Sequence, residues 1–208
     1  MTRARLMILS VLVLFSLSVA GAQGNLLPVG TSGAGVSAGF AAAKGVTTFG
    51  ATAGYSLWGR LDLGVSAGHI NRNPSSVSDI PYTYHGSYIS PQVMWYVLRA
   101  DENSGDLSIG FGAAYQYVKF SDKPDSPKEN SFVSNVSIFQ DVLPPSSSFS
   151  LQPVVSISVV KGEESQTIAS AGFFAGIKNV VGRVVGLSAV VGYQAAIVTG
   201  GLSVSAVF

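Results

Sequence analysis

Residues 107–117 read Leu-Ser-Ile-Gly-Phe-Gly-Ala-Ala-Tyr-Gln-Tyr, and this stretch decides the fold. Every second position, from Leu107 through Phe111 to Tyr117, is apolar or aromatic, and the positions between them are Ser, Gly, Ala or Gln. Successive side chains of an extended strand point to opposite faces. The period of two therefore predicts a β-strand with one apolar face and one small, uncharged face.

The same alternation recurs along most of the chain. Charged, Pro-rich or Gly-rich pieces separate the alternating segments and predict turns, among them 44–45, 58–60 and 199–201. A strand every 15 to 20 residues or so fits antiparallel hairpins better than alternating strands and helices. The ten predicted strands are residues 33–42, 47–57, 61–69, 85–97, 107–117, 131–141, 149–159, 167–177, 184–194 and 202–208.

Composition excludes several classes of protein. Charged residues make up 11% of the chain, against about 25% in ordinary globular domains, and hydrophobic residues make up 47%. Without Arg3 and Arg5, ten basic and eleven acidic residues remain, so the sequence predicts no nucleic-acid partner. With no cysteine, the chain has neither a disulfide framework nor a cysteine for lipid attachment.

The N-terminal residues have the pattern of a secretory signal peptide. Arg3 and Arg5 precede the apolar run 6–19, and Ala20 and Ala22 form an A-x-A cleavage site. The run is shorter than the ~20 residues that a membrane helix needs. We therefore expect residues 1–22 to be a cleaved signal peptide and residues 23–208 to form a single domain.

The chemistry of the polar face indicates which face meets which medium. A face exposed to bulk water carries about 25 to 35% charged residues, whereas this face carries almost none. Small uncharged residues suit the inside of a barrel, and strands in lipid must close on themselves to satisfy their backbone hydrogen bonds. We predict an all-β fold, a closed antiparallel up-and-down transmembrane β-barrel of about ten strands, or eight if the weaker segments 131–141 or 167–194 are not strands.

The C-terminal strand carries a resemblance to a known family. Leu202, Val204, Ala206 and the terminal Phe208 alternate with small residues. Together with the signal peptide and the alternating strands, this resembles the small outer-membrane β-barrel proteins of Gram-negative-type bacteria. The resemblance implies a location in the outer membrane, both chain ends in the periplasm, contact with outer-membrane lipid and lipopolysaccharide, and recognition of these four residues by the barrel assembly machinery.

Aromatic residues are expected at the two membrane interfaces of such a barrel. The orientation places loops 71–83, 121–130 and 161–166 outside the cell. The general preference of aromatic residues for strands is the alternative explanation. The predicted periplasmic belt is Tyr55, Trp58, Trp95, Tyr96, Phe149 and Phe208, and the predicted outer belt is Phe40, Tyr84, Tyr115 and Tyr117.

Few residues suggest chemistry. His69 and His85 are the only histidines, and they flank a predicted loop that contains Asp79; solvated interface residues are the favoured interpretation over a metal site. His85 and Ser87 resemble the His-x-Ser element of outer-membrane lipid A deacylases, but Tyr88 follows where that family has Asn, and no acidic residue comes shortly after to orient the histidine. We predict no enzymatic activity, no cofactor and no metal.

The sequence leaves two functions of the barrel open. One is a structural role or a weakly selective pore for small solutes, because no charged ring is visible and Asp62 is the only acid that the alternation places in the middle of the lumen. The alternative is a surface-interaction scaffold without conductance. An outer-membrane lipid hydrolase is less favoured than either.

Overall fold

The computed structural model describes nine stretches of the chain. The signal peptide and its cleavage residues Ala20 and Ala22 lie outside them, as do most of the predicted exterior loops. The described residues are 27–43, 46–72, 84–99, 107–121, 128–143, 147–162, 165–180, 183–194 and 197–208.

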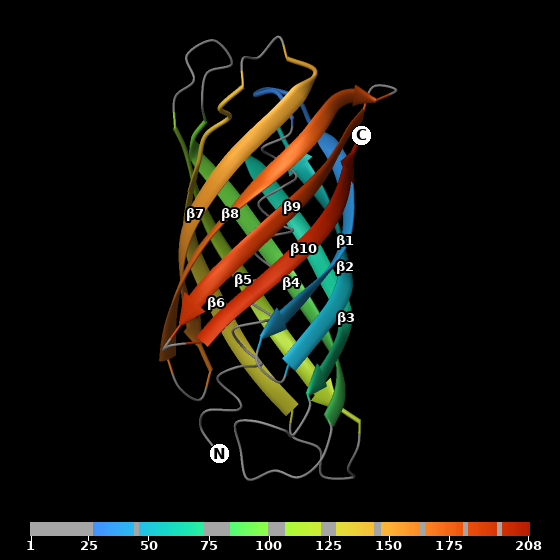
Figure 1. Cartoon of the computed structure of the whole chain (residues 1–208), viewed down its shortest axis with the longest axis vertical. Coiled ribbons are helices and arrows are strands. Elements are labelled where there is room, and N and C mark those ends of the chain that lie inside the picture. Colours follow the sequence, from blue (N-terminus) through green and yellow to red (C-terminus); the bar gives the residue numbers. More distant parts are fainter. Residues whose placement is uncertain are drawn as a thin grey trace.

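Ten antiparallel strands form one closed barrel, as Figure 1 shows, and each strand pairs with its neighbours in the chain. The last strand pairs with the first, with Phe40 opposite Leu202, so that the sheet has no free edge. The prediction of a closed up-and-down barrel with ten strands is confirmed, and the alternative of eight is wrong. The strands are β1 Gly33–Ala43, β2 Val46–Leu57, β3 Leu61–Arg72, β4 Tyr84–Leu98, β5 Ser108–Phe120, β6 Lys128–Phe139, β7 Phe149–Lys161, β8 Ser165–Val180, β9 Arg183–Gln194 and β10 Ile197–Val207.

One predicted turn is wrong. Residues 199–201 were expected to form a turn, but they lie inside β10, where Thr199 pairs with Ala43 and Gly201 with Ala41. The small Gly and Ala residues let the two backbones approach closely, and closure of the barrel gives this segment a partner on each side. Tertiary pairing therefore outweighs the local turn signal.

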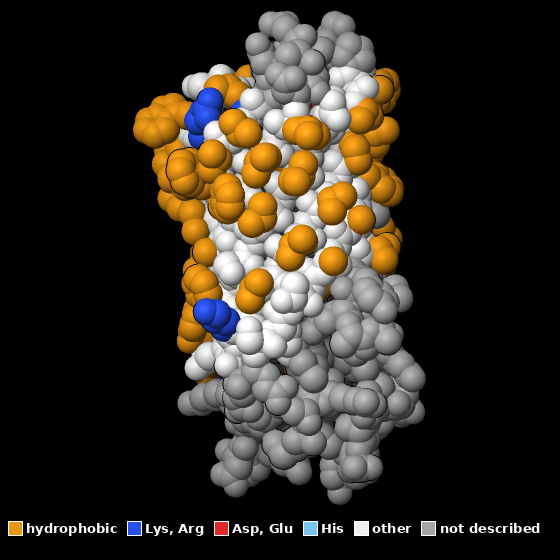
Figure 2. Space-filling view, turned by 90° about the vertical axis from the view of Figure 1, so that its left-hand side faces the viewer, with side chains coloured by type: hydrophobic (Ala, Val, Ile, Leu, Met, Phe, Trp, Pro, Cys, Tyr) orange, Lys and Arg blue, Asp and Glu red, His pale blue; other side chains and the backbone are white. Residues whose placement is uncertain are grey.

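The two walls of the barrel differ as the alternation predicts. On the face shown in Figure 2, apolar side chains cover the outer wall, and Lys and Arg side chains lie only towards the two ends. The strands are 11 to 16 residues long, against the ~9 to 11 that a tilted strand needs to cross a bilayer. Among the described residues, no helix is long and apolar enough to span a membrane.

The turn between β2 and β3 lies at the same end of the barrel as the start of the described chain and Phe208, and we call this end periplasmic after the orientation that the resemblance implies. Trp58 (φ 53°) and Gly59 (φ 61°) both adopt left-handed backbone, and the Arg60 amide donates to the Leu57 carbonyl at 2.9 Å, so that residues 58–60 form a tight connection between the paired Leu57 and Leu61. A left-handed tryptophan is uncommon. The Trp58 amide donates to Ser32 Oγ at 2.9 Å, and this bond places Ser32 beside the turn.

Candidate functional site: the inner wall and the exterior rim

A row of hydroxyl groups crosses the inner wall from strand to strand. Ser37, Thr52, Ser66 and Ser90 lie opposite one another on β1 to β4, and all four are buried inside the barrel. Thr52 Oγ1 and Ser66 Oγ are 2.5 Å apart, and Gln92 Nε2 donates to Ser66 Oγ at 3.2 Å. Because side chains at paired positions share a face, the register alone assembles this row.

Further polar contacts continue on β5 to β8. Ser131 Oγ donates to Gln116 Oε1 at 3.3 Å, and the hydroxyls of Ser156 and Ser170 are 2.6 Å apart. Other hydroxyls of this wall have no hydrogen-bond partner among the described residues, and they have the capacity to bind water or a polar solute. They are those of Ser37, Ser56, Ser90 and Ser158.

Two large inward-facing side chains, Tyr88 and Met94, lie close to glycines of nearby strands. A Cβ atom at Gly50 would meet the Tyr88 hydroxyl, and one at Gly68 would lie 2.9 Å from Tyr88 Cε1. A Cβ atom at Gly110 would lie 3.0 Å from Met94 Sδ. The glycines thus leave room beside the wall for side chains that would otherwise project towards the barrel axis.

The periplasmic end of the lumen holds a cluster that sequence reasoning missed. Tyr96, which is 0% exposed, donates its hydroxyl hydrogen to Asp62 Oδ2 at 2.8 Å and meets the Phe139 ring edge-on at 5.6 Å between centroids. Tyr96 is therefore an inner-wall residue, and its assignment to the periplasmic belt is wrong. Asp62 does face inward, but as the second residue of β3 it lies near the periplasmic end and not in the middle of the lumen.

Arg99 connects this cluster to the start of the described chain. Its guanidinium carbon lies 5.4 Å from the centre of the Tyr96 ring, within the range of a cation–π contact. Its Nη1 and Nη2 donate at 2.8 Å to the carbonyls of Gly59 and Leu27. No local signal in the sequence pointed to these contacts, because Leu98, which directly precedes Arg99, is 53% exposed.

The predicted assembly residues line the outside of the closing strand. Leu202, Val204 and Phe208 are exposed on the outer wall, and Ala206 is half-buried. Phe208 exchanges two backbone hydrogen bonds with Ala34, each of 2.9 Å. Recognition of these residues by the assembly machinery stays a prediction.

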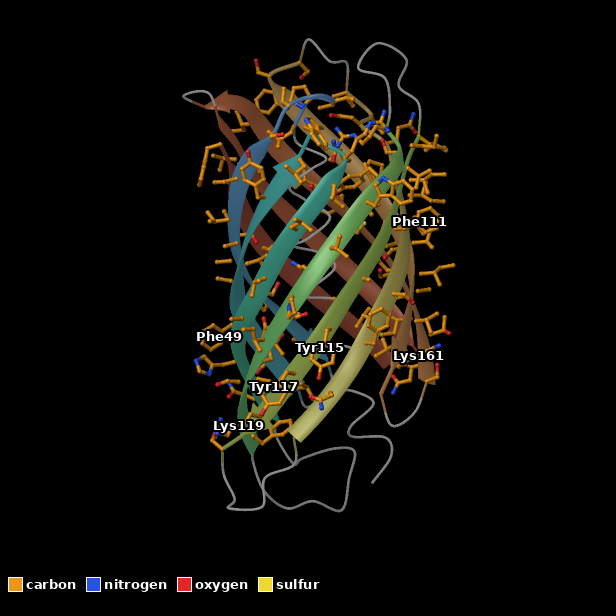
Figure 3. All side chains as sticks on the ribbon, turned by 180° about the vertical axis from the view of Figure 1, so that it is seen from behind. Phe49, Phe111, Tyr115, Tyr117, Lys119 and Lys161 are labelled. Carbon is orange, nitrogen blue, oxygen red and sulfur yellow. The ribbon has the colours of Figure 1, made fainter. Side chains whose placement is uncertain are left out.

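The interface aromatics separate into two groups along the barrel. The aromatic side chains of both groups are exposed, except that of Tyr117, which is half-buried. In Figure 3, Phe49, Tyr115 and Tyr117 lie towards one end together with Lys119 and Lys161, and Phe111 lies towards the opposite end. Their anchoring role stays a prediction. The structure places Tyr55, Trp58, Trp95 and Phe149 at the periplasmic ends of their elements and Phe40, Tyr115 and Tyr117 towards the exterior ends.

The two histidines lie on the outer wall at the exterior end, in contacts that differ from the deacylase resemblance. Ser87 Oγ contacts His69 Nδ1 at 3.2 Å, and His85 Nδ1 contacts Asn71 Oδ1 at 2.8 Å. Ser87 thus pairs with the histidine of β3 and not with His85, because antiparallel register sets His69 opposite Ser87. Among the side chains that the structure describes at this rim, none is a carboxylate that would complete a catalytic triad.

Metal chemistry receives no geometric support from the described residues. No group of three or more His, Cys, Asp or Glu side chains there is close enough to hold an ion. Asp79, which the sequence places between the histidines, lies outside the described residues.

These observations define the class of protein. An apolar outer wall, an inner wall that carries the small polar side chains of the strands and a sheet closed on itself together form the arrangement that a bilayer requires of strands. The chain is a transmembrane β-barrel, and an outer-membrane location follows from this fold, because such barrels span bacterial outer membranes.

Three solved structures resemble the chain, and the first of them supports the fold. The translocator domain of the autotransporter NalP from Neisseria meningitidis matches at 12% identity with a TM-score of 0.50, over 95% of each chain. The outer membrane protease OmpT from Escherichia coli matches at 7% identity and a TM-score of 0.35, over 85% of this chain and 93% of its own. A loop-deletion mutant of the Vibrio cholerae outer membrane protein OmpT matches at 11% identity and a TM-score of 0.33, over 78% of this chain and 54% of its own.

The comparisons give no narrower assignment. No family model and no curated protein matches the chain. The likeness to the NalP domain is a likeness of architecture, so any activity has to be argued from the walls of this barrel.

Proposed function

We propose that this outer-membrane barrel is a narrow, weakly selective pore for water and small uncharged polar solutes. The observation that carries the proposal is the set of small polar side chains on the inner wall, among which Ser37, Ser56, Ser90 and Ser158 have hydroxyls without a partner among the described residues. A buried hydroxyl without a partner costs free energy, and hydrogen bonds to water in the lumen would remove that cost.

The glycines beside two large inner side chains support room within the lumen, although Met94, Tyr96 and Phe139 also pack together there as an apolar cluster. Tyr88 lies along the glycines of β2 and β3, and Met94 lies along Gly110 of β5. Ten strands also enclose a wider lumen than the roughly eight at which side chains just fill a barrel. A large inner residue therefore narrows this lumen less than its volume suggests.

The charges of the inner wall support weak selectivity. Asp62 and Arg99 have opposite signs and both lie within reach of Tyr96. Selective pores concentrate charges of one sign in a ring, whereas a mixed pair gives a small net field along the lumen. Cations and anions should then pass with similar, low conductance.

Conductance in planar bilayers tests the proposal. The processed protein, purified from the outer membranes of an expressing strain, should give discrete conductance steps. Tyr96→Ala should enlarge the steps because it removes a ring from the lumen, whereas Trp95→Ala should leave them unchanged because Trp95 faces outward, 56% exposed. A folded barrel that gives no steps would support the scaffold without conductance.

The outward residues of β10 support the predicted assembly partner. Phe208 has backbone bonds that survive substitution and a side chain that is 49% exposed on the outer wall. Phe208→Ala should lower the amount of heat-modifiable, folded protein in cells and leave refolding in detergent unchanged. Equal yields in cells would contradict a role of Phe208 in assembly.

A further inference from the structure

The outer wall changes from apolar to polar along one row of residues at its exterior end. His69 of β3, Ser87 of β4 and Lys119 of β5 lie opposite one another, and all three side chains are exposed. The outward-facing residues of these strands on the periplasmic side of the row are apolar or aromatic. They are Leu61, Leu63, Val65 and Ala67 on β3, Ile89, Pro91, Val93, Trp95 and Val97 on β4, and Ile109, Phe111, Ala113, Tyr115 and Tyr117 on β5.

We propose that this row, together with His85 and Asn71, binds the phosphate group of a lipid headgroup in the outer leaflet. We call these five residues the rim cluster. Headgroups lie where an apolar wall gives way to polar residues, and the cluster occupies that border on three adjacent strands. The proposal is independent of whether the lumen conducts.

The cluster presents positive charge and hydrogen-bond donors together. Lys119 supplies an ammonium group, Ser87 a hydroxyl and the two histidines imidazoles, all suited to phosphate oxygens. Among the side chains that the structure describes at this end of the barrel, none is an Asp or Glu that would repel the phosphate. An anion is therefore the ligand that the charge favours.

Internal contacts hold Ser87 and the two histidines in place. The contacts of Ser87 with His69 and of His85 with Asn71 join β3 to β4 through side chains, and the rings of His69 and Phe49 are 5.2 Å apart. Ser121 Oγ also donates to the His85 carbonyl at 3.1 Å, which ties β4 to the end of β5. Donors fixed before binding lose little conformational freedom when the ligand arrives.

The neighbouring wall favours a lipid over free phosphate. Phe49 lies opposite His69, and Ile89 is the next outward residue after Ser87; their side chains are 54% and 48% exposed. A headgroup on the rim cluster would therefore leave its acyl chains lying along these side chains, and that apolar contact adds to the binding free energy of a lipid but not of a free phosphate ion.

Native mass spectrometry of the purified protein in a maltoside detergent tests the proposal with three probes. These are phosphatidic acid, diacylglycerol with the same acyl chains, and inorganic phosphate. We expect retention of phosphatidic acid only, and about tenfold weaker retention for Lys119→Gln and for the double variant His69→Gln/His85→Gln. Heat-modifiable gel mobility establishes that each variant is folded.

Lys161→Gln is the matched control. Lys161 is exposed on the outer wall at the same end, but its partners across the strands are Phe132 and Ser165 and not histidines. Retention should therefore stay unchanged in this variant. Equal loss for Lys161→Gln and Lys119→Gln, equal retention of diacylglycerol, or binding of inorganic phosphate as tight as that of phosphatidic acid would each overturn the proposal.

Discussion

The inner and outer walls of the barrel are built from alternate residues of the same strands, and they depend on structure in different ways. On the outer wall, side chains such as Val65 and Trp95 stand exposed and need only to be apolar. On the inner wall, Ser66 is hydrogen-bonded to Gln92 and Tyr96 to Asp62. Tyr88 fits against Gly50 and Gly68. The outer wall therefore responds to changes in polarity, and the inner wall to changes in shape and hydrogen bonding.

The largest expected effect comes from a charge on the outer wall. Val65 lies within the apolar outward series of β3, so Val65→Arg should lower the free energy of unfolding in lipid vesicles by about 2 to 4 kcal/mol. Urea titration followed by gel mobility measures this change. Val65→Leu keeps the wall apolar and should cost less than about 0.5 kcal/mol. A tolerated arginine would contradict contact of this wall with lipid.

The second largest effect is expected from the loss of a hydrogen bond on the inner wall. Tyr96→Phe keeps the ring but removes the hydroxyl that donates to Asp62, and hydrogen bonds to charged groups contribute about 1.5 to 3 kcal/mol. We expect a loss of that size in the same urea titration. Tyr115→Phe makes the same chemical change on the exposed outer wall and should alter stability by less than about 0.5 kcal/mol. Equal losses of stability would mean that the tyrosine hydroxyl contributes no more on the inner wall than on the outer wall.

The sequence predicted the outer wall and the topology better than the contents of the lumen. Alternation over 107–117 and 149–159 located strands to within a few residues, because a period of two is a local property. Tyr96 and Arg99 could not be assigned in the same way, since their roles depend on Asp62 of β3 and on Leu27, which is 72 positions before Arg99. Only register and closure bring such residues together.

The difference between local pattern and cross-strand register also explains the contacts of the histidines. The sequence singled out His85 and Ser87 of one strand, whereas Ser87 contacts His69 of the adjacent strand. Side chains two apart on a strand point the same way but stand well separated, while residues directly opposite on paired strands have Cβ atoms about 5 Å apart. A cross-strand neighbour becomes visible only when the register is known.

A third effect concerns the glycines on which the large inner side chains rest. A methyl group at Gly68 would meet the Phe49 carbonyl and Tyr88, so Gly68→Ala should cost about 1 to 3 kcal/mol of stability. Gly64→Ala is the control on the same strand, because its nearest atoms, Ala53 O and Gln92 Nε2, lie at 3.3 Å and need to move little. Similar stability of the two variants would contradict a specific fit of Tyr88.

The smallest expected difference lies between two hydroxyls that are opposite each other. Ser66→Ala removes the partner of Thr52 Oγ1 and of Gln92 Nε2 and should cost about 1 to 2 kcal/mol. Ser90 has no partner for its hydroxyl among the described residues, so Ser90→Ala should change stability by less than about 0.5 kcal/mol. Because both residues are fully buried at paired positions, burial and strand context are matched. If Ser90→Ala costs as much as Ser66→Ala, a tightly held lumen water or another group satisfies Ser90, and its hydroxyl belongs to the bonded part of the inner wall.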